Sequence, residues 1–333
     1  MKATLHAGTP ATPTLREIQA PVRDRLVEAS DELKRIVTAD LPLIDSVNAH
    51  LLLMKGKMFR PTLVLLASDV EGKSERRAST LAATVELVHL ATLVHDDSVD
   101  HSALRRGMPT VNSLFTHQVS VIMGDFLYSR AMVELVRTRD IDILGVLADA
   151  TNEMTIGEMR QLTALDALAF TEDDYEALIR AKTASLLSAA CEIGALVGGG
   201  HREALARYGL WLGMAFQVAD DLLDYTADSA VLGKPSGLDL REHKVTLPLI
   251  AALREISPTA RREVDELFAN PEPSDEQIER VVRIVDDAGG LEYAARRADE
   301  YASAAAEALE GLPESPVLRS LHDAIAYAVR RSR

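Results

Sequence analysis

The spacing of apolar residues constrains the fold most strongly, because it follows the helical repeat along most of the chain. Long stretches of this kind occupy residues 79–100, 119–136, 141–162 and 203–225. We find no alternation of apolar and polar residues long enough for a useful β-strand. Aromatic residues make up only 4% of the sequence, while alanine and leucine are abundant, which also favours helices. We therefore predict an all-α fold, in which the 47% of hydrophobic residues form a sizeable core.

The chain of 333 residues is predicted to form one domain over residues 14–333. Residues 1–13 are rich in Thr, Pro and Ala and are predicted to be a flexible tail. Residues 15–49 have helical periodicity with scattered charges. No low-complexity linker divides the sequence, so a second domain is not expected.

Two segments between the predicted helices have the composition of loops. Residues 105–109 are basic, and residues 226–244 contain Gly, Pro and Asp. Another helix is expected from about residue 175 to residue 198. Thr171 is its predicted N-cap, with Asp174 three residues later as in a capping box.

Charge and cysteine content exclude several classes of protein. The formal net charge of −15 argues against a broad nucleic-acid binder, which would be basic. The single cysteine, Cys191, rules out an intrachain disulfide and fits a reducing compartment, where it would be a small buried hydrophobe. The N-terminus lacks the apolar run of a secretory signal. No uninterrupted apolar stretch reaches the ~18 residues of a membrane span, so we expect no transmembrane segment and a cytoplasmic location.

Two of the apolar stretches end in the same pattern of carboxylates. The first is Asp96-Asp97-Ser98-Val99-Asp100, and the second is Asp220-Asp221-Leu222-Leu223-Asp224. Residues four apart share one face of a helix, so Asp96 is expected beside Asp100 and Asp220 beside Asp224. A single pattern of this kind could as well be a solvated acidic helix end. The repetition after two apolar helices favours a function.

Such carboxylate clusters are costly unless cations neutralise them, because like charges repel and helix C-termini disfavour negative charge. Oxygen-only ligands suit a hard cation such as Mg²⁺. Mg²⁺ typically uses one or two carboxylates together with substrate phosphates. The two clusters therefore predict a site in which several Mg²⁺ ions grip one diphosphate.

Basic residues near these clusters predict sites for phosphate groups. Any one of them alone would ordinarily be a solvated surface charge. Arginine binds phosphate through two parallel hydrogen bonds and lysine supplies a point charge, so their grouping indicates two anion sites. One would be bridged by metal and the other held directly. The grouped residues are Lys55, Lys57, Arg60, Arg105, Arg106, Lys182, Lys234 and Lys244.

His89 is a further candidate, since it lies seven residues before Asp96 and two helical turns place both on nearly the same face. A lone histidine there is more often a core or capping residue. The alternative is a hydrogen bond from its ring to phosphate. The sequence leaves both interpretations open.

These motifs together resemble the trans-type polyprenyl diphosphate synthases, from about residue 55 to residue 248 and onward to the C-terminus. The matching segments are KGKMFRP, ELVHLATLVHDDSVD, RRGMPT, MGDFLYSRA, GEMRQL, AKTASL, FQVADDLLDY and GKPSGLDLREHKVTLP. The resemblance implies an isoprenoid-synthase bundle of antiparallel helices around a deep central cavity, and a homodimer. It also implies the head-to-tail condensation of isopentenyl diphosphate with an allylic diphosphate primer, with release of pyrophosphate.

The resemblance also implies roles for individual residues. All six aspartates and Lys182 would be catalytic, and Mg²⁺ would be bound directly by Asp96, Asp100 and Asp220, with Asp97, Asp221 and Asp224 in support. Isopentenyl diphosphate would be held by Lys57, Arg60, His89 and Arg106. The allylic diphosphate would be surrounded by Arg105, Lys182, Thr183, Gln217, Lys234 and Lys244.

Three residues depart from the family pattern. Lys55 stands where Gly is frequent, Leu238 where a polar residue is common, and His243 where Gly usually precedes Lys244. The last two bear on how the loop after residues 203–225 closes.

The length of the product is predicted from two small residues. In short-chain relatives a bulky aromatic residue four or five positions before the first aspartate closes the cavity, whereas here these positions are Thr92 and Ala91. The resemblance therefore implies a deep pocket and an all-trans product of about C30 to C50 for a quinone side chain. The alternatives are a short-chain farnesyl or geranylgeranyl diphosphate synthase and a non-catalytic partner subunit of a heteromeric synthase.

Overall fold

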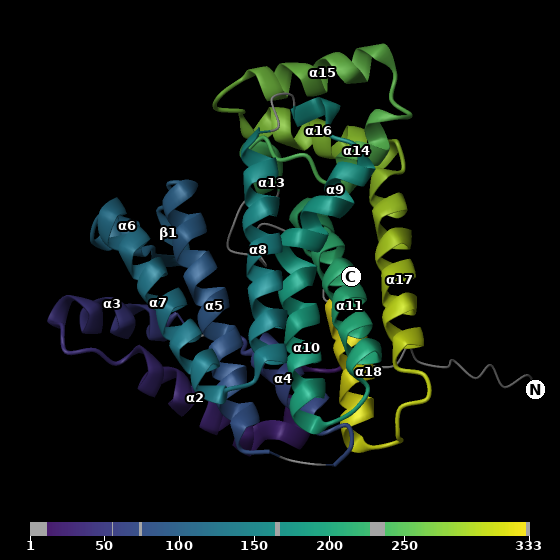
Figure 1. The fold of residues 1–333 in the computed structure, drawn as a ribbon. Helices are drawn as coiled ribbons and strands as arrows, with labels where there is room; N and C mark the ends of the chain where they lie inside the picture. Colours follow the sequence, from purple (N-terminus) through teal and green to yellow (C-terminus); the bar gives the residue numbers. More distant parts are fainter. Residues whose placement is uncertain (1–11, 55, 73–74, 164–166, 227–236, 331–333) are drawn as a thin grey trace, which may run out of the picture.

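The structure, a computed structural model, describes residues 12–54, 56–72, 75–163, 167–226 and 237–330, and most of these residues lie in helices (Figure 1). The first half of the chain contains α1 (Leu15–Ile18), α2 (Arg23–Val37), α3 (Pro42–Leu53), α4 (Phe59–Ser68), α5 (Arg77–Val99), α6 (Val111–Leu114), α7 (His117–Thr138) and α8 (Ile141–Thr163). The second half contains α9 (Glu172–Ile179), α10 (Ser185–Gly198), α11 (Arg202–Thr226), α13 (Leu238–Arg241), α14 (Leu247–Leu253), α15 (Pro258–Ala269), α16 (Asp275–Asp287), α17 (Gly290–Ala308) and α18 (Pro316–Arg330). The predicted all-α fold is confirmed.

The long helices agree with the predicted ones to within a few residues, and two differences are found elsewhere. The expected helix over residues 15–49 is divided by proline at two helix starts, Pro21 in the 3₁₀ turn Ala20–Val22 and Pro42 in α3. The capping box of Thr171 and Asp174 is present and begins α9 as predicted. The segments expected to be loops contain short regular elements instead.

The predicted basic loop over residues 105–109 is a tight hairpin. Its strands β1 (Leu104–Arg105) and β2 (Met108–Pro109) pair antiparallel and are the only strands in the described part of the chain. Arg106 and Gly107 join them with φ of 52° and 75°. Positive φ at both central residues is what a two-residue hairpin turn requires, because its twist then matches that of the strands. The prediction of an irregular loop was wrong here.

Apolar side chains form two cores that meet along α11. Leu205, Tyr208 and Leu212 in the first half of α11 pack into a large core with α2, α4, α5, α7 and α10. Val218 and Leu222 in its second half pack into a smaller core with α9 and α13 to α17. The helix that ends in the second carboxylate cluster is therefore buried along its length in both cores.

Glycines allow the central helices to approach closely. A Cβ on Gly194 or Gly198 of α10 would lie 2.4 Å from the Val64 carbonyl or 2.5 Å from the Ser68 carbonyl of α4. A Cβ on Gly209 of α11 would lie 2.5 Å from the Leu187 carbonyl of α10. Separations this short are excluded for real side chains, so glycine fixes the packing of α4, α10 and α11.

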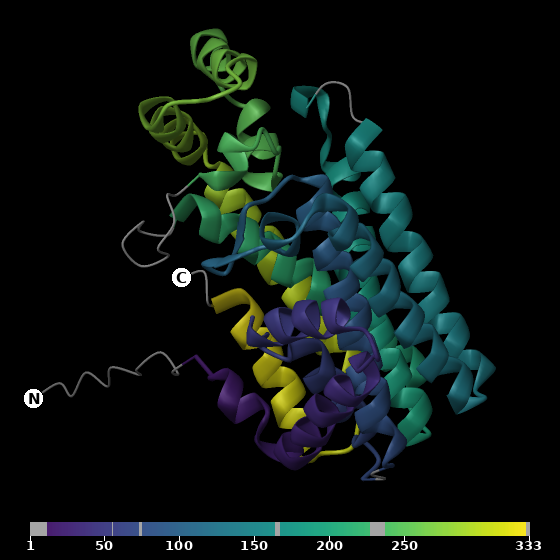
Figure 2. The same cartoon turned by 90° about the vertical axis from the view of Figure 1, so that its left-hand side faces the viewer.

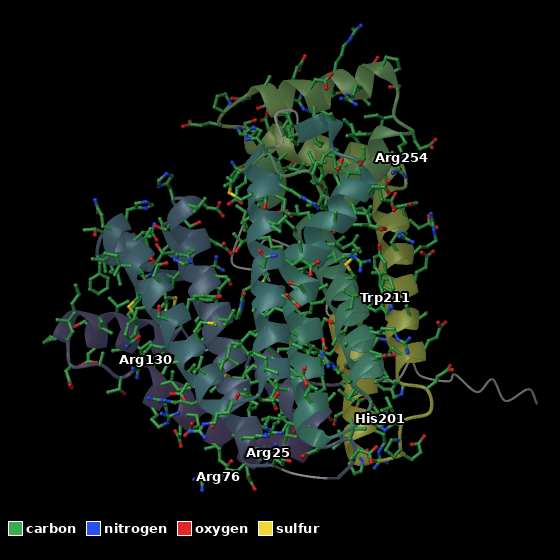
Figure 3. The ribbon with its side chains drawn as sticks, in the orientation of Figure 1. Arg25, Arg76, Arg130, His201, Trp211 and Arg254 are labelled. Atoms are coloured by element: carbon green, nitrogen blue, oxygen red, sulfur yellow. The ribbon has the colours of Figure 1, made fainter. Side chains whose placement is uncertain are left out.

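The two helices that carry the carboxylate clusters run in the same direction. Arg76 and His201, which precede α5 and α11, both lie at the lower end of the bundle in Figure 3. The carboxylate ends therefore both point toward the upper end, where Figure 1 shows β1 and α13. By length and composition α5 could cross a membrane, but its most apolar window is 67% buried, as for a core helix.

Candidate active site

The first carboxylate cluster ends α5, and its three aspartates differ in surroundings. Asp97 is buried, and both of its oxygens accept hydrogen bonds from Nε of Arg105 at 2.8 and 2.9 Å. Asp96 is half-buried, and Asp100 is exposed at the helix C-cap. The hairpin therefore neutralises the middle aspartate and leaves the other two available to a cation.

The end of α5 is fixed by contacts from the segment that follows it. Ser98 is fully buried, and its Oγ lies 2.7 Å from Nδ1 of His117, which begins α7. The carbonyl of Ser102 accepts hydrogen bonds from Oγ1 of Thr110 at 2.6 Å and from Nδ2 of Asn112 at 3.1 Å. These contacts hold the last turn of the helix, and with it the aspartates, in one orientation.

The second cluster ends α11, and its middle aspartate is held by neutral donors. Asp221 is buried, where it accepts a hydrogen bond from the Tyr175 hydroxyl at 2.5 Å and from Nε2 of Gln217 at 2.8 Å. Oε1 of Gln217 accepts from the hydroxyl of Thr183 at 2.7 Å. The chain Thr183–Gln217–Asp221 places two of the residues predicted for the allylic diphosphate against this cluster. No pattern in the sequence marked Tyr175 as a partner of this cluster.

Asp224 has a structural role that its position in the motif does not suggest. Its two carboxylate oxygens accept from the backbone N–H groups of Leu238 at 3.1 Å and Asp239 at 3.0 Å, which begin α13. A carboxylate is stabilised at a helix N-terminus by these otherwise unpaired donors. The contact brings the carboxyl group of Asp239 beside the cluster, a fourth aspartate that sequence reasoning missed although it lies in the GLDLREHK segment.

Lys182 and Thr183 lie in a π-helical turn, Arg180–Ala184, between α9 and α10. The sequence predicted a continuous helix, and single π turns of this kind often occur at functional sites. Nζ of Lys182 lies 2.7 Å from Oε1 of Glu158 and donates to Oε1 of Gln161 at 3.2 Å. Glu158 and Gln161 belong to the GEMRQL segment of α8 and were not singled out as site residues.

The electrostatics link the two clusters to one site. Burial raises the pKa of Asp96 to about 6, with Lys182 opposing and Glu158 and Asp100 adding to the rise. Lys182 therefore acts on the first cluster, while its neighbour Thr183 is bonded into the second. The two adjacent residues of the π turn thus contact different clusters, Lys182 the first by its charge and Thr183 the second through Gln217.

Lys244 makes a second link between the clusters. Burial opposes its protonation, but Glu242 at 2.6 Å and the charges of Asp100 and Asp239 raise the pKa of Lys244. Burial and the charge of Asp224 raise the pKa of Asp239 to about 7. Lys244 thus acts electrostatically on Asp100 of the first cluster and on Asp239 beside the second.

A separate cationic group lies around Glu86 on α5. Glu86 is buried, and burial raises its pKa against the opposing charges of Arg60 and Arg106. Burial lowers the pKa of His89 well below its usual value, and both arginines add to this, so the ring is neutral at pH 7. Arg60, His89 and Arg106 are thus brought together as predicted. Glu86 was missed, because a glutamate inside an apolar helix has no distinctive pattern.

The segment that precedes α4 passes directly over this group. A Cβ on Gly56 would lie 3.1 Å from Oε1 of Glu86 and 3.5 Å from a terminal nitrogen of Arg106, so the glycine permits the close approach. Lys57 is exposed, with its Nζ 5.7 Å from the ring of Tyr327 in α18. Nε of Arg60 is buried and has no hydrogen-bond partner among the described residues.

The remaining predicted residues fall into three groups. Lys55 and Lys234 lie outside the described residues. Leu238 contributes its backbone N–H to Asp224, so a polar side chain is not needed for that contact. Ala91 is buried in α5, and Thr92 donates its hydroxyl to the His89 carbonyl at 2.8 Å within the same helix.

The donor set fits a hard divalent cation that is shared with a ligand. All candidate ligands are carboxylate oxygens, and the raised pKa of Asp96 shows that its negative charge lacks full compensation. In the described part of the chain no three acidic, histidine or cysteine side chains are grouped closely enough to enclose an ion alone. An ion bound by these carboxylates would take further oxygen ligands from water or from a bound anion.

Comparison with known proteins agrees with this chemistry. Residues 41–285 match the family model described as polyprenyl synthetase. The chain belongs to the polyprenyl synthetase family. It is 39% identical over 319 residues to an all-trans-nonaprenyl-diphosphate synthase (geranyl-diphosphate specific) of Rhodobacter capsulatus, covering 95% of this chain and 98% of that protein. It is 36% identical over 322 residues to an octaprenyl diphosphate synthase of Haemophilus influenzae, covering 96% and 98%.

Solved structures of polyprenyl synthetases have the same fold. A polyprenyl synthase from Caulobacter crescentus complexed with calcium and isoprenyl diphosphate has a TM-score of 0.91 at 33% identity, covering 98% of this chain and all of that chain. A decaprenyl diphosphate synthase from Rhodobacter capsulatus also has a TM-score of 0.91, at 37% identity, covering 96% and 100%. The isoprenoid-synthase type of helix bundle predicted from the motifs is therefore confirmed.

Proposed function

We propose that this chain is a Mg²⁺-dependent long-chain polyprenyl diphosphate synthase. It would extend an allylic diphosphate primer head to tail with isopentenyl diphosphate, to an all-trans product of about C30 to C50. The observation that carries the proposal is the pair of carboxylate helix ends that meet at one π turn. The charge of Lys182 acts on Asp96, and the adjacent Thr183 is hydrogen-bonded to Gln217, which contacts Asp221. The relatives named as nonaprenyl and octaprenyl diphosphate synthases support a long product.

The reaction needs no protein nucleophile. The allylic C–O bond breaks, and its electron pair leaves with pyrophosphate. The double bond of isopentenyl diphosphate attacks the resulting cation and forms the new C–C bond. A proton is then lost from the adjacent carbon to the released pyrophosphate, which restores a double bond. The protein must stabilise the charge on the departing diphosphate and exclude water, which would quench the cation.

Asp96, Asp100 and Asp220 would hold Mg²⁺ together with the allylic diphosphate. When bound, Mg²⁺ supplies positive charge that neutralises the leaving group. Lys182 is held by Glu158 and Gln161 and would add positive charge at the allylic diphosphate. Arg105 is held at Asp97 by its Nε, and its terminal nitrogens would donate to the allylic diphosphate.

Isopentenyl diphosphate would bind at the group formed by Lys57, Arg60, His89 and Arg106. The unpaired buried Nε of Arg60 supports an anionic ligand at this place, because a buried donor without a partner is costly. Neutral His89 would donate one ring N–H to a phosphate oxygen. Glu86 compensates the arginines in the absence of substrate.

Product length tests the long-chain proposal directly. The purified chain, incubated with isopentenyl diphosphate and geranyl or farnesyl diphosphate, is expected to give products of about C30 to C50. Replacing Thr92 by Phe is expected to shorten them, because the ring would block the space beside α5. Finding only farnesyl or geranylgeranyl diphosphate from the unaltered chain would favour the short-chain alternative.

The same assay separates an independent enzyme from a partner subunit. A chain that needs no second protein is expected to be active alone once Mg²⁺ is added. Inactivity with all six aspartates intact would support a heteromeric synthase. We also propose a cytoplasmic location, which is consistent with the named relatives.

We further propose a homodimer formed through α7 and α8. Both helices expose large apolar side chains, including Ile122 at 67%, Val136 at 62% and Ile141 at 76% exposure. A second copy would cover this surface in a two-fold symmetric contact. Replacing Ile122 and Val136 by Glu should convert the dimer to a monomer in light scattering. A chain that is already monomeric would contradict the proposal.

A further inference from the structure

The short helix α13 ends in a conformation that normally requires glycine. The N–H of His243 bonds to the Leu240 carbonyl at 3.1 Å, and the N–H of Lys244 bonds to the Asp239 carbonyl at 2.8 Å. This pair of bonds is a Schellman motif, and the residue at its turning point must have positive φ. His243 occupies that point with φ of 54°. Glycine adopts this conformation without steric cost, so a histidine there requires a compensating contact.

The ring of His243 makes that contact with the connection between α15 and α16. Its Nε2 lies 2.9 Å from the carbonyl oxygen of Asn270, and the ring meets Phe268 edge to face at a centroid distance of 5.6 Å. A carbonyl can only accept, so the histidine nitrogen is the donor. The histidine thus uses its side chain to attach the end of α13 to a neighbouring helix pair.

The residues that receive His243 are themselves held in place. The side chain of Asn270 donates to Oε1 of Gln277 at 2.9 Å, and the same oxygen accepts from the N–H of Ser274 in the capping box of α16. Arg241 adds a second attachment, from one terminal nitrogen to the Pro273 carbonyl at 3.0 Å. Figure 2 shows the green α15–α16 pair projecting from one end of the bundle.

The attached segment contains two groups of the active site. Asp239 lies beside Asp224 through the N-terminus of α13, and Lys244 acts electrostatically on Asp100. We propose that His243 is a positioning residue, which attaches α13 to the α15–α16 connection and so holds Asp239 and Lys244 ready for the allylic diphosphate. The inference rests on the role proposed above for this site.

His243→Gly tests the inference without adding backbone strain, since glycine suits the left-handed conformation. The Michaelis constant for the allylic diphosphate is expected to rise about three- to tenfold, the range of one hydrogen bond. The Michaelis constant for isopentenyl diphosphate should stay within about twofold, because the group proposed to bind it lies around Glu86. Arg241→Ala, which removes the second attachment, should act in the same direction.

His201→Gly is the matched control. His201 also has positive φ, 59°, and its ring also has a partner, Glu71, but it lies at the opposite end of the bundle (Figure 3). This variant should leave the Michaelis constants unchanged.

Hydrogen exchange separates the inference from the function it rests on. In His243→Gly the amide of Lys244 should exchange faster in the ligand-free chain, whatever the activity. Unchanged exchange together with an unchanged Michaelis constant for the allylic substrate would overturn the inference. Lys244→Gln should raise that Michaelis constant on its own. If it does not, the assignment of Lys244 is wrong, while the exchange result still decides whether the attachment exists.

Discussion

The two carboxylate helix ends share one sequence pattern, but the protein holds their middle aspartates by different means. Burial raises the pKa of both. For Asp97 the charge and hydrogen bonds of Arg105 oppose that rise. Among the described residues Asp221 accepts from the neutral donors Tyr175 and Gln217, and with the charge of Asp239 adding to the effect of burial its pKa is raised well above its usual value. The motif therefore determines where carboxylates stand, and the neighbouring elements determine their charge.

The last aspartates of the two motifs differ as well. Asp100 is exposed at the end of α5, whereas the carboxylate of Asp224 caps α13. The second cluster is thereby joined to a segment that supplies Asp239 and Lys244. The first cluster is joined to the hairpin by the hydrogen bonds between Asp97 and Arg105. The second cluster should accordingly be the more sensitive of the two to changes in distant elements.

The largest effects on turnover are expected from the first aspartate of each cluster, because both clusters are proposed to bind Mg²⁺ through it. Replacing Asp96 or Asp220 by Ala should each lower turnover by about a thousandfold, because charge on the leaving group would be left uncompensated. The far-ultraviolet circular dichroism should remain helical. Glu279→Ala, on an exposed face of α16, is the control and should keep full activity. Near-normal turnover in either aspartate variant would refute the assignment.

Replacing each middle aspartate by asparagine should change the free energy of unfolding by different amounts in the two clusters. Asp97→Asn should lower the free energy of unfolding by about 2 kcal/mol, since the charged bond to Arg105 is lost. Asp221→Asn should cost about 1 kcal/mol or less in the metal-free chain, because burial already favours the neutral form. Urea unfolding measures both. A larger loss of stability in Asp221→Asn than in Asp97→Asn would show that Asp221, and not Asp97, is the charged middle aspartate.

A smaller effect is expected from the neutral donors of the second cluster. Tyr175→Phe removes the hydrogen bond to Asp221 and should lower the free energy of unfolding by about 1 kcal/mol. Tyr128→Phe is the control. Its hydroxyl lies 3.3 Å from Thr151 at the surface, so the change should stay within about 0.5 kcal/mol. Equal effects of the two substitutions would mean that the buried contact does not hold Asp221.

A pH dependence of the stability is expected as well. The pKa of Asp96 is raised from the usual 3.8 to about 6, and that of Asp239 from 3.8 to about 7. Between the usual pKa and the raised pKa of each group, the folded chain therefore binds more protons than the unfolded chain. The free energy of unfolding without metal therefore falls as pH rises from about 4 to about 7. Asp239→Asn should gain stability relative to the parent over the same range in calorimetry. A difference that is constant with pH would contradict the raised pKa.

The sequence predicted the ligand-bearing helices well, because apolar periodicity and repeated carboxylates are local patterns. The resemblance assigned Arg60, His89 and Arg106 to one site. In the structure both arginines act electrostatically on His89. The sequence could not predict the contacts of Asp221 with Tyr175, which lies 46 residues away, since nothing in a lone tyrosine marks its partner. The contact between the ring of His243 and the carbonyl of Asn270 could not be predicted for the same reason, because the two residues are distant in the sequence.

The π turn around Lys182 shows a second limit of the sequence. Residues 175–198 have the composition of one helix, and the extra residue that re-aims Lys182 leaves the periodicity almost unchanged. Packing against α8 and α11 determines the π turn. A Cβ on Gly157 of α8 would lie 2.7 Å from the Cβ of Ala181, so α8 approaches the turn closely. Contacts between helices, which no local pattern encodes, therefore set the aim of this side chain.

Binding of a bisphosphonate, measured by calorimetry with and without Mg²⁺, tests most directly whether the two carboxylate ends form one metal-dependent diphosphate site. We predict binding only when Mg²⁺ is present, and its loss in Asp96→Ala and in Asp220→Ala alike, with the double variant no worse than either. Binding without Mg²⁺, or binding that survives when either cluster is removed, would contradict the account.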